Sequence, residues 1–579
     1  MKRLISTLLV AITVLSTFAF VGCGDNGINK NMTQLYVYSY NGGVGNEWLT
    51  QTIAAFEDAY KDVSFEEGKT GVQVIADKAL KITGKTMIDT IAASEYEVIF
   101  NEGITYNNWV LQNKFLDITD VVQEADASGK SIEDRLSDTQ KNVLSQHGGK
   151  YYAVPHYEAF RGVMFDEDLF REQNFYFADD RTYGNFILNA DQRKSCGPDG
   201  QYDTYDDGLP SSVEEFFLLL DEMLEKDITP FIWSGEQEAY PLFLLSAFAD
   251  TFAGVDQALL DYSFGVGAAA GKNVADIVTG IRKTGDTFLR DTGTGELLSV
   301  PYTVATTQTP VAERNGYLLK QTEAKFRALE FLFGIFNKSD YYVRDGMATA
   351  THSNRDAQED FIFSKFEAGN KGVKRVAMII EGTFWEVEAK DSFDLSEETF
   401  ASGTTDRSFG MMPMPVRYDG TVREGEGHKQ VLNNYINAYC GINANIKPHK
   451  IDLAKTFVRF CYGDDMLNLF TRMTGMKKGV EYPIYDDTLE QMSKFYRNVL
   501  RLREESDVIF MNSTSNLFKN RENALVDYET FWATEIDGAE YNYPTLAFKG
   551  NKKNPKAYFE GMALDERYWT TTYGDYFSA

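Results

Sequence analysis

The hydrophobic positions early in the chain follow two different periods. Residues 35–38 and 71–75 are short runs rich in aromatic and β-branched residues, whereas apolar residues between positions 49 and 60 recur every three to four residues. The first pattern indicates strands and the second indicates an amphipathic helix. A third short run at 96–100 follows another helical stretch. This alternation predicts an α/β fold with a mostly parallel sheet covered by helices.

Two polar residues follow these predicted strands. Asn41 comes after the run at 35–38, and Glu102 comes after the run at 96–100. In open α/β sheets, ligands bind beyond the carboxyl ends of the strands. Asn41 and Glu102 are therefore candidate ligand contacts, although either residue could cap a helix instead.

The middle and the end of the chain keep both patterns. Ser211-x-x-Glu214 is a capping box, which predicts the start of an amphipathic helix. Strand-like segments return at 375–380 and 409–414, and the chain beyond residue 451 is largely helical. We find no internal repeat.

The N-terminus reads as a secretory signal. Two basic residues precede an apolar stretch over residues 4–20, which ends in Val-Gly-Cys23. These last residues resemble a bacterial lipobox, which implies a signal peptide of residues 1–22, acylation of Cys23 and a tether that ends at residue 32. An ordinary secreted protein with a chance cysteine is the alternative. Elsewhere the sequence has no run of roughly 20 uninterrupted apolar residues, the length a bilayer crossing needs.

Composition narrows the choice of partners. The 579-residue chain has 86 acidic and 57 basic residues and a formal net charge of −29, so its surface repels phosphate backbones and argues against nucleic acid. A hydrophobic content of 43% is typical of a folded globular protein, and the length allows two or more domains. Apart from Cys23, the chain has Cys196, Cys440 and Cys461, without a C-x-x-C pair, which indicates neither a disulfide framework nor a zinc site.

Several separate stretches resemble one family in their order along the chain. They follow the lipobox and occupy residues 38–63, 96–120, 149–170, 228–236, 376–388 with 409–416, and 439–470. Together they are similar to the extracellular solute-binding proteins of ABC importers, in the carbohydrate-binding branch. The resemblance covers most of the chain, but residues 171–210 and the stretch after residue 483 are longer than the family leads one to expect.

The resemblance implies a two-lobed periplasmic-binding-protein-like fold with a hinge of several crossing segments and a ligand cleft between the lobes. The expected division is residues 33–157 for the first lobe, 158–380 for the second, 381–432 for the first again and 433–579 for the second with a C-terminal extension. The implied function is delivery of a carbohydrate to ABC transporter permease subunits. The implied protein is a monomer that is not an enzyme, anchored by lipid at the extracytoplasmic face of the membrane.

Sugar chemistry selects the candidate ligand contacts. A pyranose has apolar C–H faces that stack on aromatic rings, and its hydroxyl groups need polar side chains. Besides Asn41 and Glu102, the candidates are Trp109, Glu158, Arg161, Trp233, Glu381, Trp385, Asn434 and Tyr435.

Each of these candidates has a structural alternative. Trp385 is expected to stack on ligand rather than to pack in a core, whereas Trp233 and Trp109 could do either. Glu158 and Arg161 could bond to ligand or pair with each other. The asparagine at 434 could simply form a turn.

Four acidic residues lie close together in the long insertion. Asp199, Asp203, Asp206 and Asp207 are separated by glycines and polar residues. Ca²⁺ prefers six to eight oxygen ligands, which such a loop can supply, although the spacing is not that of an EF-hand. A structural calcium site and a solvated acidic loop both remain open, and no cofactor is required.

The sequence has no strong catalytic motif. It lacks G-x-S-x-G, H-E-x-x-H and Walker patterns, and its five histidines form no local constellation. A lipid-anchored glycoside hydrolase remains the alternative, because two carboxylates across a cleft leave no local signature. A binding protein for a peptide or a metal ion is a third possibility, since the scaffold does not fix the ligand.

Overall fold

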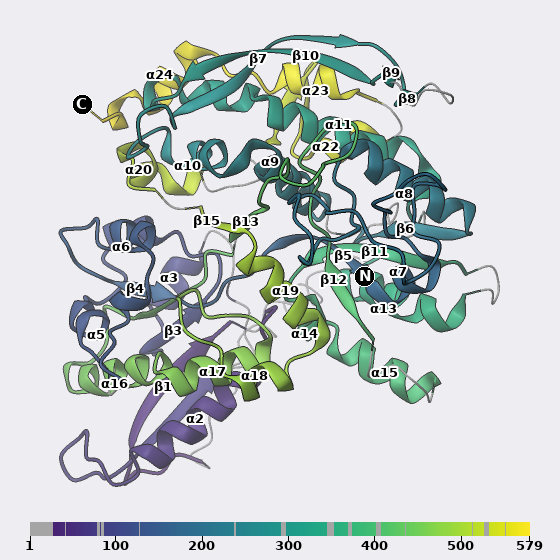
Figure 1. Cartoon of the computed structure of the whole chain (residues 1–579). Coiled ribbons are helices and arrows are strands. Elements are labelled where there is room, and N and C mark those ends of the chain that lie inside the picture. The colour runs from purple at the N-terminus through teal and green to yellow at the C-terminus, as the bar shows by residue number, and fades with distance from the viewer. Residues whose placement is uncertain are drawn as a thin grey trace, which may run out of the picture.

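The protein is described by a computed structural model, in which two lobes lie side by side (Figure 1). The structure describes residues 27–578 except 41, 78–81, 83–85, 127, 237–238, 291–296, 344–351, 369–372, 401–406, 435, 512, 526–531 and 550–551. The candidates Asn41, Tyr435 and Cys23 lie outside the described residues.

The first lobe is built on a five-stranded sheet in the order β2-β1-β3-β14-β4. Its strands are β1 (Thr33–Ser39), β2 (Val72–Asp77), β3 (Val98–Asn101), β4 (Ala153–Pro155) and β14 (Tyr439–Ile442). β1 pairs in parallel with β2 and β3, as the early sequence pattern predicts, and β14 pairs antiparallel with β3 and β4.

Helices of the first lobe come from both ends of the chain. They include α2 (Glu47–Ala59), α4 (Tyr106–Leu111), α16 (Ile451–Cys461) and α17 (Asp464–Thr474). Phe56 of α2 and Phe457 of α16 are buried with their ring centroids 4.9 Å apart. The first lobe therefore needs the segment after residue 438 to complete both its sheet and its core.

The second lobe has a four-stranded sheet in the order β12-β5-β11-β6. Its strands are β5 (Arg161–Asp166), β6 (Ile228–Ile232), β11 (Arg375–Gly382) and β12 (Phe409–Met411). The main helices around it are α8 (Val213–Glu225), α9 (Pro241–Ala258), α11 (Glu323–Asn337) and α13 (Asn354–Glu367). The cap of α8 lies one residue beyond the predicted capping box: Ser212 accepts a 3.1 Å hydrogen bond from the backbone N–H of Glu215.

The strand pairing differs from the expected division of the chain. Residues 381–432 contribute β12 to the second sheet, where it pairs with β5, instead of returning to the first lobe. Residues 433–579 begin with β14 and α16 of the first lobe. The reason is that β11 ends at the lobe boundary without crossing it, whereas the chain does cross between β13 (Val431–Asn434) and β14.

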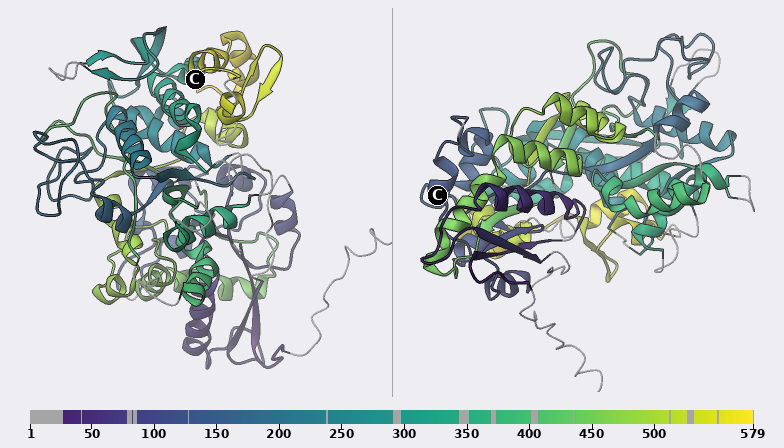
Figure 2. Two further views of the ribbon diagram at one scale, coloured as in Figure 1. Left: turned by 90° about the vertical axis from the view of Figure 1, so that its right-hand side faces the viewer. Right: turned by 90° about the horizontal axis from the view of Figure 1, so that it is seen from below.

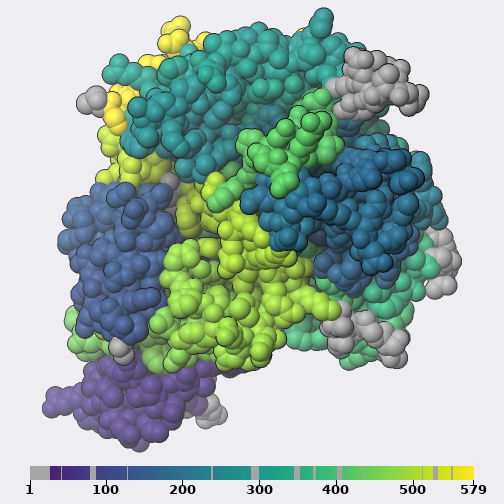
Figure 3. All heavy atoms as spheres, viewed as in Figure 1, coloured from purple at the N-terminus to yellow at the C-terminus, as the bar shows by residue number. Residues whose placement is uncertain are grey.

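The last hundred residues cross back and cover the second lobe. α19 (Lys494–Glu504) packs on β12, and β15 (Asp507–Phe510) pairs in parallel with β13. Figure 3 shows this yellow-green segment between the blue surface of the first lobe and the second lobe. α22 (Pro544–Phe548), α23 (Pro555–Gly561) and α24 (Glu566–Tyr573) then lie near the long hairpin of β7 (Val274–Lys283) and β10 (Tyr302–Pro310), as Figure 2 shows.

α20 (Asn516–Leu525) contacts helices of both lobes, namely α4 of the first and α10 (Leu260–Ser263) of the second. Within the described residues, no helix has the length and apolar character needed to cross a membrane.

Candidate ligand site between the two lobes

The two lobes meet where the turn after β1 faces the turn after β11. A Cβ atom added at Gly43 would lie only 2.6 Å from Cγ of Phe384, so the backbone of one lobe rests on an aromatic ring of the other. Gly45 lies next to Val387 and has a φ of 59°, in the region that favours glycine. We call this region and the side chains around it the inter-lobe contact zone.

The first lobe contributes two phenols and a carboxylate to the inter-lobe contact zone. The hydroxyl group of Tyr157, in the crossing after β4, donates a hydrogen bond to the carboxylate of Glu102, beyond the end of β3. Tyr40 follows β1, and burial, then repulsion from Glu102 and Glu388, raises its pKa to about 12. Tyr40 is therefore a protonated hydrogen-bond donor at neutral pH, and carboxylates of both lobes act on it.

The second lobe contributes a pair of carboxylates. Glu381 lies at the end of β11, and Glu388 ends the short helix α14 (Trp385–Glu388) that follows. The side-chain amide of Gln358 donates to both, at 3.1 Å to Glu381 and 3.4 Å to Glu388. Burial, then repulsion from Glu388, raises the pKa of Glu381 well above its usual range. Gln358 is thus the neutral group that holds two acids side by side.

Two stacked aromatic rings and an arginine lie beside these acids. Tyr240 and Phe243, at the start of α9, are stacked with ring centroids 4.7 Å apart. The guanidinium of Arg161, at the start of β5, lies 4.4 Å from the centroid of the Phe243 ring. Burial, followed by the charge of Glu381, raises the pKa of Tyr240. Of the predicted contacts that the structure describes, Glu102, Arg161 and Glu381 lie in the inter-lobe contact zone.

The three candidate tryptophans are core residues, and their prediction as ligand platforms is corrected. Trp385 is fully buried, with its ring centroid 5.1 Å from that of Phe409, and its indole nitrogen has no hydrogen-bond partner in the described structure. The ring of Trp109 stacks on that of Phe115, with centroids 4.8 Å apart. The ring of Trp233 packs against that of Phe336 within the second lobe, with centroids 5.3 Å apart. All three lie beside the predicted strand ends, but their side chains turn inward.

Glu158 and Asn434 hold the crossings of the hinge rather than face a cleft. Glu158 accepts from Arg503 of α19 at 2.5 Å, so its ion-pair partner is not Arg161. Arg503 also pairs with Glu481 at 2.5 Å. The side-chain oxygen of Asn434 accepts from the backbone N–H of Ala159 at 3.2 Å, which ties the two crossing segments together. Both candidates are satisfied within the protein.

The acidic loop is held by its own hydrogen bonds. The hydroxyl group of Thr204 lies 3.0 Å from Asp206 and 3.4 Å from Asp199, and the backbone N–H of Asp203 donates to Asp207 at 2.9 Å. Burial, followed by repulsion from Asp199, raises the pKa of Asp206 to about 8. Across the described residues, no three or more His, Cys, Asp or Glu side chains are arranged to hold a metal ion. Calcium binding by this loop stays a prediction.

Most polar and aromatic groups of the inter-lobe contact zone are not among the predicted ligand contacts. Tyr40, Tyr157, Phe384 and Glu388 do lie inside the stretches 38–63, 149–170 and 376–388 that resemble the solute-binding proteins. Their place in those stretches is the one signal in the sequence that points to them. Tyr240 and Phe243 lie in none of them, and nothing in the local pattern separates these two rings from core aromatics.

Comparison with known proteins adds evidence for the fold. No family model matches the chain, and no curated protein matches its sequence. A solved chitin oligosaccharide binding protein matches with a TM-score of 0.51 and 11% identity over 94% of this chain and 100% of its own. The maltose-bound MalE3 of T. maritima matches with a TM-score of 0.50 and 13% identity, over 93% and 99% of the two chains.

A third solved structure, the GacH receptor of Streptomyces glaucescens, matches with a TM-score of 0.50 and 12% identity, over 94% of this chain and 99% of its own. At these identities the likeness is one of fold. The prediction of an α/β, two-lobed periplasmic-binding-protein-like fold is therefore confirmed.

Proposed function

We propose that this protein captures a carbohydrate between its two lobes and delivers it to an ABC importer, without chemical change to the sugar. The inter-lobe contact zone carries the proposal, because both lobes contribute hydrogen-bonding groups to it beside stacked rings. Phenols and carboxylates suit sugar hydroxyls, and the rings at 240 and 243 suit the C–H face of a pyranose. The solved structures of the same fold that are described as binding chitin oligosaccharide and maltose support this ligand class.

Capture works by closure. Tyr40 and Glu102 would hold the sugar from the first lobe, and Arg161 and Tyr240 from the second. A ligand that contacts both sides binds only the closed state fully, so binding shifts the equilibrium toward closure. The closed lobes would then present a surface for the permease subunits.

The protein is proposed to act as a monomer at the extracytoplasmic face of the membrane, held there by a lipid on Cys23. Replacing Cys23 with alanine is expected to abolish acylation and move the protein from membranes into the soluble fraction. Membrane association that survives Cys23→Ala would overturn the proposed anchor.

Calorimetric titration of the purified protein tests the ligand class. The titrants are chito-, malto-, xylo- and raffinose-type oligosaccharides, applied to the unmodified protein and to Tyr240→Ala and Glu102→Gln. Each variant is expected to weaken binding at least tenfold, since each removes a group from one side of the sugar. Tyr568→Ala, on an exposed ring of α24, is the matched control and should leave affinity unchanged.

The same samples separate binding from catalysis. After long incubation the bound oligosaccharide is expected to be recovered intact. Release of smaller sugars that is lost in Glu388→Gln would establish a glycoside hydrolase instead. If none of the sugars binds, the proposed function is overturned.

A further inference from the structure

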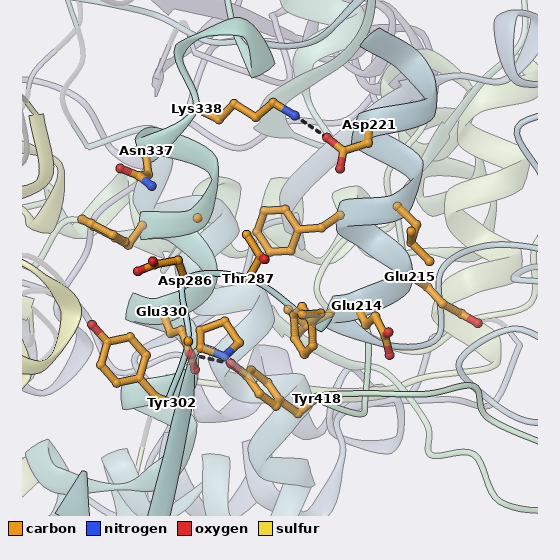
Figure 4. A pocket seen from close by; sticks show the side chains of 18 of the residues that line it. Glu214, Glu215, Asp221, Asp286, Thr287, Tyr302, Glu330, Asn337, Lys338 and Tyr418 are labelled. Carbon is orange, nitrogen blue, oxygen red and sulfur yellow. Dashed lines mark hydrogen bonds and ion pairs between the residues drawn. The ribbon is translucent and has the colours of Figure 1, made fainter. Parts of the chain in front are cut away.

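A large cavity lies within the second lobe, away from the inter-lobe contact zone. Its volume is about 960 Å³, and its walls are α8, α11, the ends of β7 and β10, and the segment 418–423 (Figure 4). The described residues that line it all belong to the second lobe and its C-terminal cover. This volume is at the upper end of the roughly 300–1,000 Å³ that encloses a drug-sized ligand.

The two helices shape the cavity by their spacing. α8 presents Glu214, Phe217 and Asp221 at intervals of three and four residues, which place them on one face of the helix. Opposite them, α11 comes close at Gly334, where an added Cβ would lie 2.4 Å from Cζ of Phe217. The ring of Phe217 therefore lies against bare backbone at the cavity wall.

The cavity has several aromatic rings in its wall. The rings of Phe288 and Tyr418 have centroids 5.1 Å apart, and the hydroxyl group of Tyr418 donates to Glu330. The aromatic lining residues are Phe217, Phe288, Tyr302, Phe333, Tyr341 and Tyr418. They offer apolar faces to a ligand, and the tyrosines among them also carry hydroxyl groups.

The charges around the cavity are largely balanced by internal pairs. Five lining acids face four lining bases. Lys338 pairs with Asp221, Lys283 pairs with Asp286 at 2.5 Å, and Arg181 pairs with Glu215 at 2.6 Å. An ionic ligand would therefore have to compete with existing pairs, and a wholly apolar ligand would bury charged groups without replacing their water.

We propose that this cavity is a second carbohydrate site, which binds a neutral oligosaccharide of a few units within one lobe. Such a ligand has C–H faces for the rings and hydroxyl groups for the paired acids and bases, so it needs no net charge in the wall. The walls do not involve the first lobe, so binding here is independent of lobe closure. The inference does not rest on the proposed inter-lobe site.

Neutral tetrasaccharides of the chito, malto and xylo series are the probes, titrated into the full chain. Leu218 lines the cavity and its side chain is 38% exposed, so Leu218→Trp narrows the cavity from its rim. Leu395, on α15 (Lys390–Phe400), is 39% exposed and outside the cavity, which makes Leu395→Trp the matched control. Two binding events are expected for the unmodified protein and the control. Leu218→Trp should keep one event and weaken the other at least tenfold.

Tyr240→Ala separates the two sites. It should weaken only the event that survives in Leu218→Trp. If the inter-lobe proposal fails, a single event should remain, insensitive to Tyr240→Ala and sensitive to Leu218→Trp. Identical titrations of Leu218→Trp and Leu395→Trp, with unchanged melting temperatures, would overturn the second site. Preferential binding of spermidine or inorganic phosphate in the cavity, over every tetrasaccharide, would also overturn the proposed second site.

Discussion

Two clusters of carboxylates connect the lobes, and their partners differ. In the hinge, Glu158 and Glu481 face the cations Arg503 and Lys477, with nitrogen–oxygen distances of 2.5–2.7 Å. We call these four residues the hinge network. In the inter-lobe contact zone, Glu102 accepts from a tyrosine, and two other acids share one glutamine amide.

The difference indicates which connection is permanent. Ion pairs within the hinge network satisfy its acids in the protein alone. In the inter-lobe contact zone, Glu102, Glu381 and Glu388 accept hydrogen bonds from neutral donors of the kind that a sugar hydroxyl can replace, and the charge of Arg161 also acts on Glu381. The sequence shows the carboxylates of both regions but not their hydrogen-bond partners. The partner of each carboxylate therefore distinguishes a structural connection from a candidate ligand site.

The largest expected effect is at the hinge network. Arg503→Leu leaves Glu158 buried without its cation, which should lower the free energy of unfolding by about 3–5 kcal/mol. Arg501→Leu, two positions earlier on α19, removes an exposed ion pair with Glu505 and an exposed hydrogen bond to the backbone oxygen of Asp203, and should cost about 1 kcal/mol or less. Urea denaturation measures both. Equal losses would show that the hinge network is no more permanent than a surface pair.

Adjacent residues test where the inter-lobe contact zone ends. Trp385→Ala removes a core ring and should lower the free energy of unfolding by about 3–5 kcal/mol. Phe384→Ala should cost less, about 1–2 kcal/mol, because its contact with Gly43 lies between lobes that can separate. Ligand affinity should respond in the opposite order. A large loss of affinity in folded Trp385→Ala would restore its role as a ligand platform.

The two clusters should also respond oppositely to pH. The pKa of Glu381 is raised by burial and Glu388, so its contribution to stability is present below the unfolded pKa and is lost as pH rises toward the folded value. Arg503 and Lys477 lower the pKa of Glu481 against the effect of burial, so its contribution is present above the unfolded pKa and is lost as pH falls. Melting curves from about pH 2 to about pH 8 measure both effects, because the loss at Glu481 falls below its unfolded pKa.

The variants assign these pH effects to their groups. Glu381→Gln should raise the melting temperature most at high pH, because glutamine stays neutral. Glu481→Gln should lower it at neutral pH and have little effect at acidic pH. The same pH dependence in both variants would contradict the comparison.

The smallest expected effect is at a third acidic cluster, the loop from Asp199 to Asp207. Its carboxylates accept hydrogen bonds from backbone and hydroxyl groups of the same loop, so chelation with EDTA should leave the melting temperature unchanged to within about one degree. A decrease on chelation that disappears in the double variant Asp203→Ala, Asp206→Ala would establish the calcium hypothesis.

The sequence predicts the sheet framework well and the direction of side chains poorly. The parallel pairing of β1, β2 and β3 follows from alternation within about 70 residues of chain. Phe384 and Trp385 carry the same sequence signal, an aromatic after a strand. The helical turn of α14 points the two rings in different directions. Phe384 lies against Gly43, whereas Trp385 lies in the core, where it packs against Phe495, more than a hundred residues later in the chain.

Features built from many separate segments leave still less local signal. The second-lobe cavity uses two helices, a hairpin and two loops, and its lining aromatics have the spacing of ordinary core residues. The expected lobe boundary at residue 381 failed for a related reason. The end of β11 looks the same in the sequence whether or not the chain then crosses, and the pairing of β12 with β5 decides the matter.

The position of β14 has a consequence for how the chain is made. β14 lies between β3 and β4, yet it follows β4 by almost three hundred residues and β3 by more than three hundred. Until residue 442 is available, β3 and β4 each expose an unpaired edge, and closing so long a loop is slow. The second sheet has its three strands β5, β6 and β11 by residue 382. The lobe that is synthesised first is therefore expected to fold last, and its open edges are where a chaperone would act on the unfinished chain.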